Sequence, residues 1–269
     1  MRAGTVTVWL SILIATLAFN TTRGEVVAHW TFEDNISGVA WPVTGHAYDL
    51  FVSVESNDDG SPNHNLDYYT KPSQTITVIS DVPPASMFNT GYTPGTQSWD
   101  TSATPSASDV MFVDGSNGDS KWTVINFTIE AFFKTGLTSH NQKIAEYPNR
   151  WALWIETTGN VKFWGSGSTT ITLPVNYNDG ELRYIAASYD STANELKIRG
   201  LAEHKLVSII TGPRNGSLAA PNNNFAVGGT YASDKFGGKL DCIRYSSRVL
   251  YIPELLAVDT PKGTVTIIN

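Results

Sequence analysis

The sequence predicts an all-β domain made of two antiparallel sheets, and three observations lead to this fold class. Apolar and polar residues alternate with a period close to two over many short segments, as they do in half-buried strands. Glycine, asparagine and aspartate separate these segments at short intervals, as they do between paired strands. Only residues 252–258 favour a helical turn, with Pro253 near its start. Many short strands of this kind are typical of an antiparallel sandwich.

The first strands are short, and a longer one follows. Residues 26–32 alternate and end at a polar turn, and residues 110–113 stop at Asp114-Gly115. Residues 126–134 (NFTIEAFFK) alternate over their whole length. One face of this strand carries Phe127, Ile129, Ala131 and Phe133, and the other carries Thr128, Glu130 and Phe132. Such alternation predicts a strand that turns an apolar face to the core.

Two hairpins are predicted next. Residues 151–156 and 161–164 are separated by Thr-Thr-Gly-Asn, and residues 182–189 and 195–199 by Asp-Ser-Thr-Ala-Asn. A glycine followed by asparagine in a short connection is a hairpin signal. Each pair is therefore expected to form two adjacent antiparallel strands.

The segment 225–256 combines glycine pairs with a dense strand. Gly228-Gly229 ends a short apolar run, and Gly237-Gly238 precedes the strand at 239–245. Glycine allows a tight turn, or the close approach of another backbone, where a side chain would clash.

One ion pair is expected within the sheet. Arg244 lies on the closing strand, and Glu130 lies on the strand at 126–134. A buried charge requires a partner, so these two residues are expected to pair for a structural rather than a functional reason.

Four blocks in a fixed order resemble a known family. They are residues 28–34 (AHWTFED), 112–136, 151–200 and 225–256. Their order resembles the laminin G-like and concanavalin A-like lectin-glucanase jelly-roll domains. The resemblance implies a two-sheet jelly-roll sandwich, formed here by one domain over residues 25–269.

Residues 36–109 depart from that family pattern as a long insertion. The insertion is rich in polar residues but also holds aromatic residues, among them Tyr92 and Trp99. Two interpretations stay open. The insertion adds edge strands and covers a sheet, or it forms a loop whose aromatic residues, Tyr92 and Trp99, contact a ligand, since long ordered loops often carry binding residues.

The N-terminal residues predict export. Arg2 precedes an apolar run at 6–19, and small and polar residues follow, which is the order of a secretory signal peptide. Cleavage after Gly24 fits best, with Ala18 as the alternative. Cys242, the single cysteine, is expected to be a packed side chain. Because exported eukaryotic modules are commonly disulfide-rich, the sequence favours a bacterial protein that is secreted or lies in the cell envelope.

Charge and motif spacing exclude several functions. The net charge of −7 and the scattered basic residues argue against nucleic acid as a partner. The mature chain has no apolar stretch long enough to span a membrane. No acidic cluster of the ExDxxE type occurs, and the five histidines have no metal-ligand spacing. The sequence therefore predicts a protein that is not an enzyme.

A binding role is expected instead, and carbohydrate is the first candidate ligand. Trp154 and Trp164 fall on the face opposite Leu153 and Phe163 in neighbouring strands. An indole offers a flat apolar surface and one N–H donor to a sugar, although tryptophans in a sheet are commonly core residues. The alternatives are a structural or adhesive surface protein that binds other proteins and, behind it, a glycoside hydrolase or polysaccharide lyase, because one fold can carry many functions.

Calcium is the one cofactor that the resemblance implies. Laminin G-like domains often hold Ca²⁺ at the rim of the sandwich, and carboxylate and carbonyl oxygens are its preferred ligands. Asp34 and Asp241 lie in the resembling blocks and are the candidate ligands. In the alternative interpretation, Asp34 ends a strand in a turn and Asp241 forms local hydrogen bonds.

Overall fold

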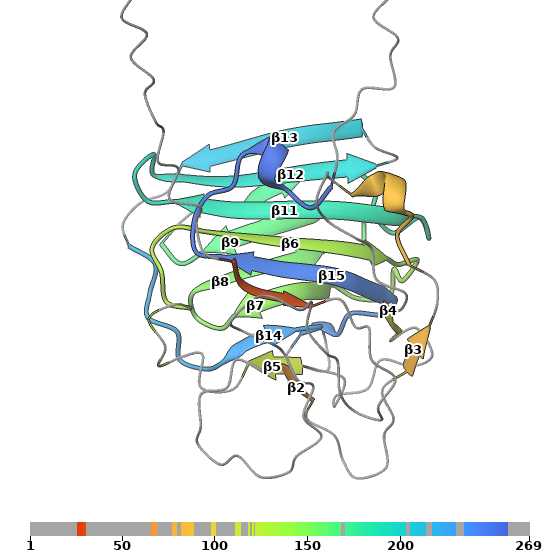
Figure 1. The fold of residues 1–269 in the computed structure, drawn as a ribbon, viewed down its shortest axis with the longest axis horizontal. Coiled ribbons are helices and arrows are strands. Elements are labelled where there is room, and N and C mark those ends of the chain that lie inside the picture. Colours follow the sequence, from red (N-terminus) through yellow and green to blue (C-terminus); the bar gives the residue numbers. More distant parts are fainter. Residues whose placement is uncertain are drawn as a thin grey trace, which may run out of the picture.

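Two antiparallel sheets, packed face to face, form the protein in a computed structural model, which confirms the predicted fold class (Figure 1). The structure describes residues 26–30, 66–68, 77–79, 82–88, 98–100, 111–113, 118, 120, 122–167, 170–202, 205–213, 217–229 and 234–257. No helix among these residues is long and apolar enough to cross a membrane.

The first sheet contains eight of the described strands. In spatial order they are β13 (Lys205–Pro213), β12 (Glu195–Ala202), β11 (Leu182–Asp190), β6 (Phe127–Lys134), β15 (Lys239–Ser246), β4 (Ser98–Asp100) and β3 (Thr77–Ile79), and β1 (Val26–Trp30) also pairs with β15. The sequence-distant strands β6 and β15 pair at its centre, and β11 and β12 form one of the two expected hairpins.

The second sheet contains seven of the described strands. In spatial order they are β10 (Ile171–Leu173), β9 (Val161–Gly165), β8 (Trp151–Ile155), β7 (Gln142–Tyr147), β14 (Phe225–Val227), β5 (Met111–Val113) and β2 (Leu66–Tyr68). The pair β8–β9 is the other expected hairpin. Strand β7 was not expected from the sequence.

The insertion contributes strands to both sheets. Strand β2 joins the edge of the second sheet, and β3 and β4 extend the first. The insertion also supplies a short 3₁₀ helix, η1 (Ala85–Met87). These segments therefore support the structural interpretation of residues 36–109.

Aromatic side chains fill the space between the sheets. Trp30, Trp122 and Trp151 are fully buried there, as expected from the sequence. Phe225 lies between them, with its ring centroid 5.0–5.8 Å from theirs. Such contacts add to the stabilisation from burying large apolar rings.

A second apolar cluster lies on the outer face of the first sheet. Residues 247–257, here called the closing strap, cross this face after β15 and include the 3₁₀ helix η4 (Ile252–Glu254) (Figure 1). The helical turn predicted at 252–258 is thus shorter than expected: the chain leaves the helix at Leu255, which is extended, and Leu255 and Leu256 are buried. Phe88, beside η1, forms a β-bridge with Ala257.

The predicted ion pair between Glu130 and Arg244 is present and holds the strap. Both residues are buried, and Arg244 Nε donates to Glu130 Oε2 over 2.5 Å. The other carboxylate oxygen accepts from the Tyr184 hydroxyl at 2.5 Å and from the Leu256 N–H of the strap at 2.7 Å. Arg244 Nη2 donates to the carbonyl of Glu254 at 2.7 Å. The buried charges are therefore compensated by each other and by the strap.

Close packing explains one of the predicted glycine pairs. A Cβ at Gly238 would lie 2.2 Å from the carbonyl oxygen of Lys134 and 3.0 Å from the Cβ of Thr135. Only glycine fits between β15 and the end of β6 at this distance.

Candidate functional site

The outward face of strands β7, β8 and β9 carries the candidate site. In β8, Trp151, Leu153 and Ile155 are fully buried between the sheets, whereas Trp154 is partly exposed. Successive side chains of a strand point to opposite faces, so Ala152 and Trp154 point outward.

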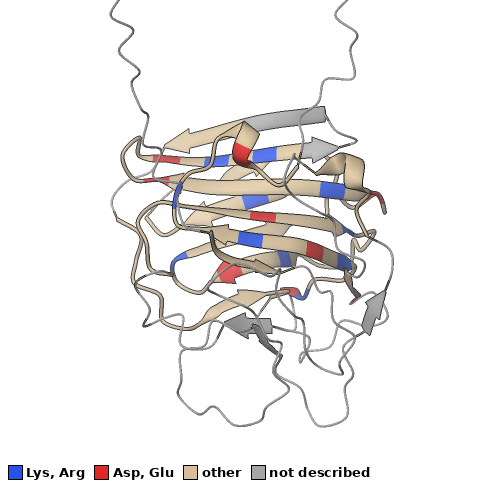
Figure 2. Cartoon of the chain, in the orientation of Figure 1, with Lys and Arg blue, Asp and Glu red and all other residues tan. Residues whose placement is uncertain are grey.

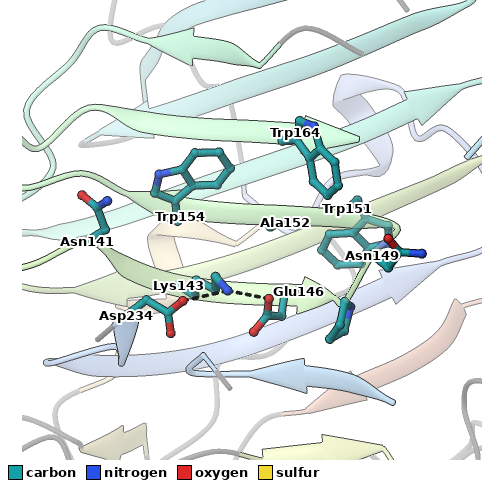
Figure 3. Close-up of a pocket in the computed structure, with 10 residues that line it drawn as sticks. Asn141, Lys143, Glu146, Asn149, Trp151, Ala152, Trp154, Trp164 and Asp234 are labelled. Atoms are coloured by element: carbon teal, nitrogen blue, oxygen red, sulfur yellow. Dashed lines mark hydrogen bonds and ion pairs between the residues drawn. The ribbon is translucent and has the colours of Figure 1, made fainter. Parts of the chain in front are cut away.

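Strand register brings two tryptophans together on this face. Ala152 of β8 pairs directly with Trp164 of β9, and Trp154 pairs with Lys162. The two tryptophans are therefore diagonal neighbours on adjacent strands, on either side of the small Ala152 (Figure 3). Ala152, Trp154 and Trp164 are called the indole face from here on. The sequence-based placement of both tryptophans on the outer face is confirmed, and their role in binding stays a prediction.

A hollow of about 340 Å³ lies over the indole face. Its apolar side is formed by Trp154 and Trp164, and Ala152 lies between them (Figure 3). Its polar side is formed by Asn141, Lys143, Glu146, Asn149 and Asp234. One wall is thus flat and aromatic, and the other carries hydrogen-bonding and charged groups.

The charged groups of the hollow form one cluster, here called the acid–lysine triad: Lys143, Glu146 and Asp234. Lys143 Nζ lies 2.7 Å from Glu146 Oε2 and 2.7 Å from Asp234 Oδ2 (Figure 3). Burial lowers the pKa of Lys143, but its hydrogen bonds to Asp234 and Glu146 outweigh this effect and raise the pKa above its ordinary value. Lys143 therefore stays a cation bound to two carboxylates.

A second ion pair lies beside Trp154. Lys162, its register partner on β9, binds Glu156 with Nζ 2.6 Å from Oε1. Both side chains keep about a quarter of their surface exposed. The lysines of this face, Lys143 and Lys162, are thus each bound to carboxylates. Figure 2 shows the basic and acidic residues dispersed among the described strands, without a basic run.

A buried arginine holds the rim of the hollow. Asn149 follows β7 in a turn with φ of 65°, a conformation that asparagine tolerates better than most residues. The next residue, Arg150, is buried and donates hydrogen bonds of 2.6–3.0 Å to the carbonyls of Ala219, Thr123 and Val124. Three separate loop carbonyls are therefore tied to the turn that carries Asn149.

The other predicted ligand-binding residues are not brought to this hollow. Trp99 lies on β4, which belongs to the first sheet and pairs with β15, so its strand is in the other layer. Tyr92 lies outside the described residues. The ligand-binding roles suggested for these two residues stay predictions.

The candidate calcium ligands are not seen together. Asp241 is buried within β15, next to the bulge at Cys242, and pairs in register with Phe132 of β6. Asp34 lies outside the described residues, and the described part of the chain has no group of three or more His, Cys, Asp or Glu placed to hold a metal. Calcium binding therefore stays a prediction. A melting temperature that is raised by CaCl₂ and lowered by EDTA would support it, and an unchanged one would contradict it.

The acid–lysine triad was missed from the sequence. Lys143 and Glu146 lie three residues apart on β7, and this i, i+3 spacing was a weak signal because a register irregularity falls between Lys143 and Ala145. Asp234 comes from a loop almost ninety residues further along the chain. Nothing local in the sequence links it to Lys143.

No protein-family model matches the chain, and no curated protein matches it in sequence. Several solved structures are similar. The CBM40 module of the *Ruminococcus gnavus* IT-sialidase, bound to α2,3 sialyllactose, is 15% identical over 65% of this chain and 94% of that one, with a TM-score of 0.41. The receptor-binding domain of botulinum neurotoxin C/D mosaic serotype is 12% identical over 84% of this chain and 49% of that one, with a TM-score of 0.47.

Mouse laminin α1 domains LG4-5 are 12% identical over 52% of this chain and 39% of that fragment, with a TM-score of 0.39. The chain thus spans less than half the length of the laminin fragment and of the neurotoxin domain. Carbohydrate-binding and laminin G domains are among the similar structures, but at these identities and TM-scores they do not establish the family or the ligand of this chain.

Proposed function

We propose that this chain is an exported, non-catalytic carbohydrate-binding module and that the indole face is its binding site. The observation that carries the proposal is the placement of Trp154 and Trp164 on the solvent side of β8 and β9, above Ala152 and inside one hollow. The apolar core does not require these two indoles, because the inward positions of the same strands already bury Trp151, Leu153 and Phe163.

The chemistry of the hollow suits a sugar. A pyranose ring has an apolar face and a polar edge, and a tryptophan offers a large flat surface with one N–H donor. Asn141 and Asn149 add amides that both donate and accept hydrogen bonds. Pockets with an apolar wall and a few convergent polar groups are typical small-molecule sites.

The spacing of the indoles favours an oligosaccharide. Diagonal neighbours on adjacent strands lie roughly 7–8 Å apart. No described ring stacks on either indole. Each indole can therefore contact its own sugar unit, with Ala152 leaving room between them.

The acidic residues of the hollow support binding rather than cleavage. Glycoside hydrolysis assigns different roles to two carboxyl groups, one as acid and one as base or nucleophile. Here the carboxylates of Glu146 and Asp234 bind the same ammonium of Lys143. Such an arrangement holds β7 and the loop at 234 in place beside the indole face.

A glycan array probed with the purified protein and three variants tests this function. Trp154→Ala and Trp164→Ala should each weaken binding at least about tenfold, or roughly 1.4 kcal/mol. Tyr251→Ala is the matched control, because Tyr251 is an exposed aromatic on the closing strap, which covers the other sheet. Undiminished binding by both tryptophan variants would contradict the assignment of the indole face, and capture of a protein partner without any glycan would favour the adhesive role.

Export is tested separately. The charged start, apolar run and small residues at 1–24 motivate it. Mass spectrometry of protein recovered from the producing cells should find an N-terminus at Glu25, or at Phe19 if cleavage follows Ala18. A chain that retains Met1 and stays in the cytosol would contradict export.

A further inference from the structure

We infer that the indole face selects uncharged oligosaccharides and discriminates against glycans that carry carboxylate or sulfate groups. This inference rests on the proposed function and names the ligand class of the same site. It comes from the ion pairs around the hollow and not from the tryptophans themselves.

The ammonium groups on this face are already bound to carboxylates. Lys143 lies 2.7 Å from each of two carboxylates, and Lys162 lies 2.6 Å from Glu156. Recognition of an acidic sugar requires a cation that can pair with it, and arginine is the usual residue for bidentate binding. No arginine is among the residues that line the hollow in the described part of the chain.

The charge of the hollow is also unfavourable to an anion. Its charged lining residues are one lysine and two acids, Lys143, Glu146 and Asp234, which leaves one net negative charge. The neighbouring Lys235 is fully buried and donates to the carbonyl of Gly229 at 2.6 Å, and it is not a lining residue.

The expected size of the discrimination follows from Coulomb's law. An acidic group held roughly 6 Å from one net negative charge binds about threefold more weakly in a water-like medium and about a hundredfold more weakly at an effective dielectric constant of 20. An uncharged sugar does not pay this cost, and its hydroxyl groups can use the carboxylate oxygens and amides as acceptors.

The test compares matched ligands on the intact protein. Affinities are measured for neutral oligosaccharides and for derivatives of the same skeleton that carry sialic acid, uronic acid or sulfate. The neutral member of each pair should bind at least about threefold more tightly, and the difference should shrink as the salt concentration rises, because salt screens charges near the surface.

Two variants make the cause specific. Glu146→Gln and Asp234→Asn each remove one negative charge from the hollow and should reduce the discrimination against acidic ligands while neutral ligands still bind. Glu195→Gln is the matched control, because it removes the same charge from β12 in the other sheet, where Glu195 lies beside Lys197. This variant should leave the discrimination unchanged.

The outcomes separate the two proposals. Acidic derivatives that bind as well as their neutral parents, with binding still lost in Trp164→Ala, would overturn the inference and leave the carbohydrate-binding function standing. Discrimination that Glu195→Gln reduces as much as Glu146→Gln would also overturn it, because the charge near the indole face would then not be the cause. An absence of glycan binding by folded protein would overturn both.

Discussion

The outer faces of the two sheets carry similar kinds of residues but have opposite fates. The outer face of the first sheet bears Phe132 and Tyr184 and is buried beneath the closing strap and η1. The outer face of the second sheet bears Trp154 and Trp164 and stays partly open in a hollow. The difference teaches that aromatic residues on an outward position become core or candidate site according to whether another segment covers them.

Charged groups differ in the same way between the two faces. Under the strap, Glu130 and Arg244 are almost completely excluded from water. On the indole face, Lys143 and Lys162 keep 18% and 27% of their side-chain surface exposed. The first pair therefore contributes mainly to holding the strap, whereas the second set can also affect a ligand through its charge.

The largest expected effect comes from breaking the buried pair. Glu130→Ala should destabilise the fold by about 3–5 kcal/mol, because Arg244 is left as an uncompensated buried charge and the strap loses a hydrogen bond. Denaturant unfolding measures the change. The double variant Glu130→Leu with Arg244→Met should recover part of the loss, and a double variant no more stable than the single one would contradict this account.

Neighbouring tryptophans of one strand should respond in opposite ways. Trp151→Ala removes a fully buried indole and should cost about 3–5 kcal/mol of stability. Trp154→Ala changes a surface position and should alter stability by only about 0.5 kcal/mol while weakening glycan binding. Thermal melts and binding titrations on both variants check the contrast. Equal destabilisation would mean that Trp154 belongs to the core.

The covered face should also make stability sensitive to alkaline pH. Burial, together with the charge of Glu130, raises the pKa of the Tyr184 hydroxyl well above its ordinary value. Burial likewise raises the pKa of Tyr245. Above about pH 10 these tyrosines ionise in the unfolded chain but stay protonated in the fold, so stability falls as pH rises, by about 1.4 kcal/mol per pH unit for each tyrosine.

Unfolding measured between pH 9 and 11 tests this expectation, with Tyr184→Phe as the comparison. The variant should lose the contribution of one tyrosine to the slope. An unchanged slope would show that Tyr184 does not contribute.

The smallest effect is expected at the exposed pair beside the indole face. Lys162→Met should change stability by no more than about 1 kcal/mol, since solvent screens a pair of this exposure. Chemical denaturation beside Glu130→Ala gives the comparison directly. A loss as large as that of Glu130→Ala would remove the proposed distinction between the two faces.

The sequence by itself determined the class of the fold and much of its pairing. Alternation over 126–134 and the hairpin signals after residues 156 and 190 predicted β6, β8–β9 and β11–β12, because strand periodicity and turn chemistry are local properties. The same periodicity placed Trp154 and Trp164 on the outward side of their strands. Even the pair of Glu130 and Arg244 was foreseen, since an ionised residue within an apolar strand needs a partner.

Only the tertiary structure decided which outward face is covered and what surrounds the indoles. The strap buries the second face of β6 because Leu255 and Leu256 leave the helical turn and pack on the sheet, and no local pattern encodes that landing place. Asp234 likewise reaches Lys143 only because the loop before β15 lies beside β7. Side-chain direction follows from the local backbone, whereas the cover over a face depends on contacts between segments far apart in the chain.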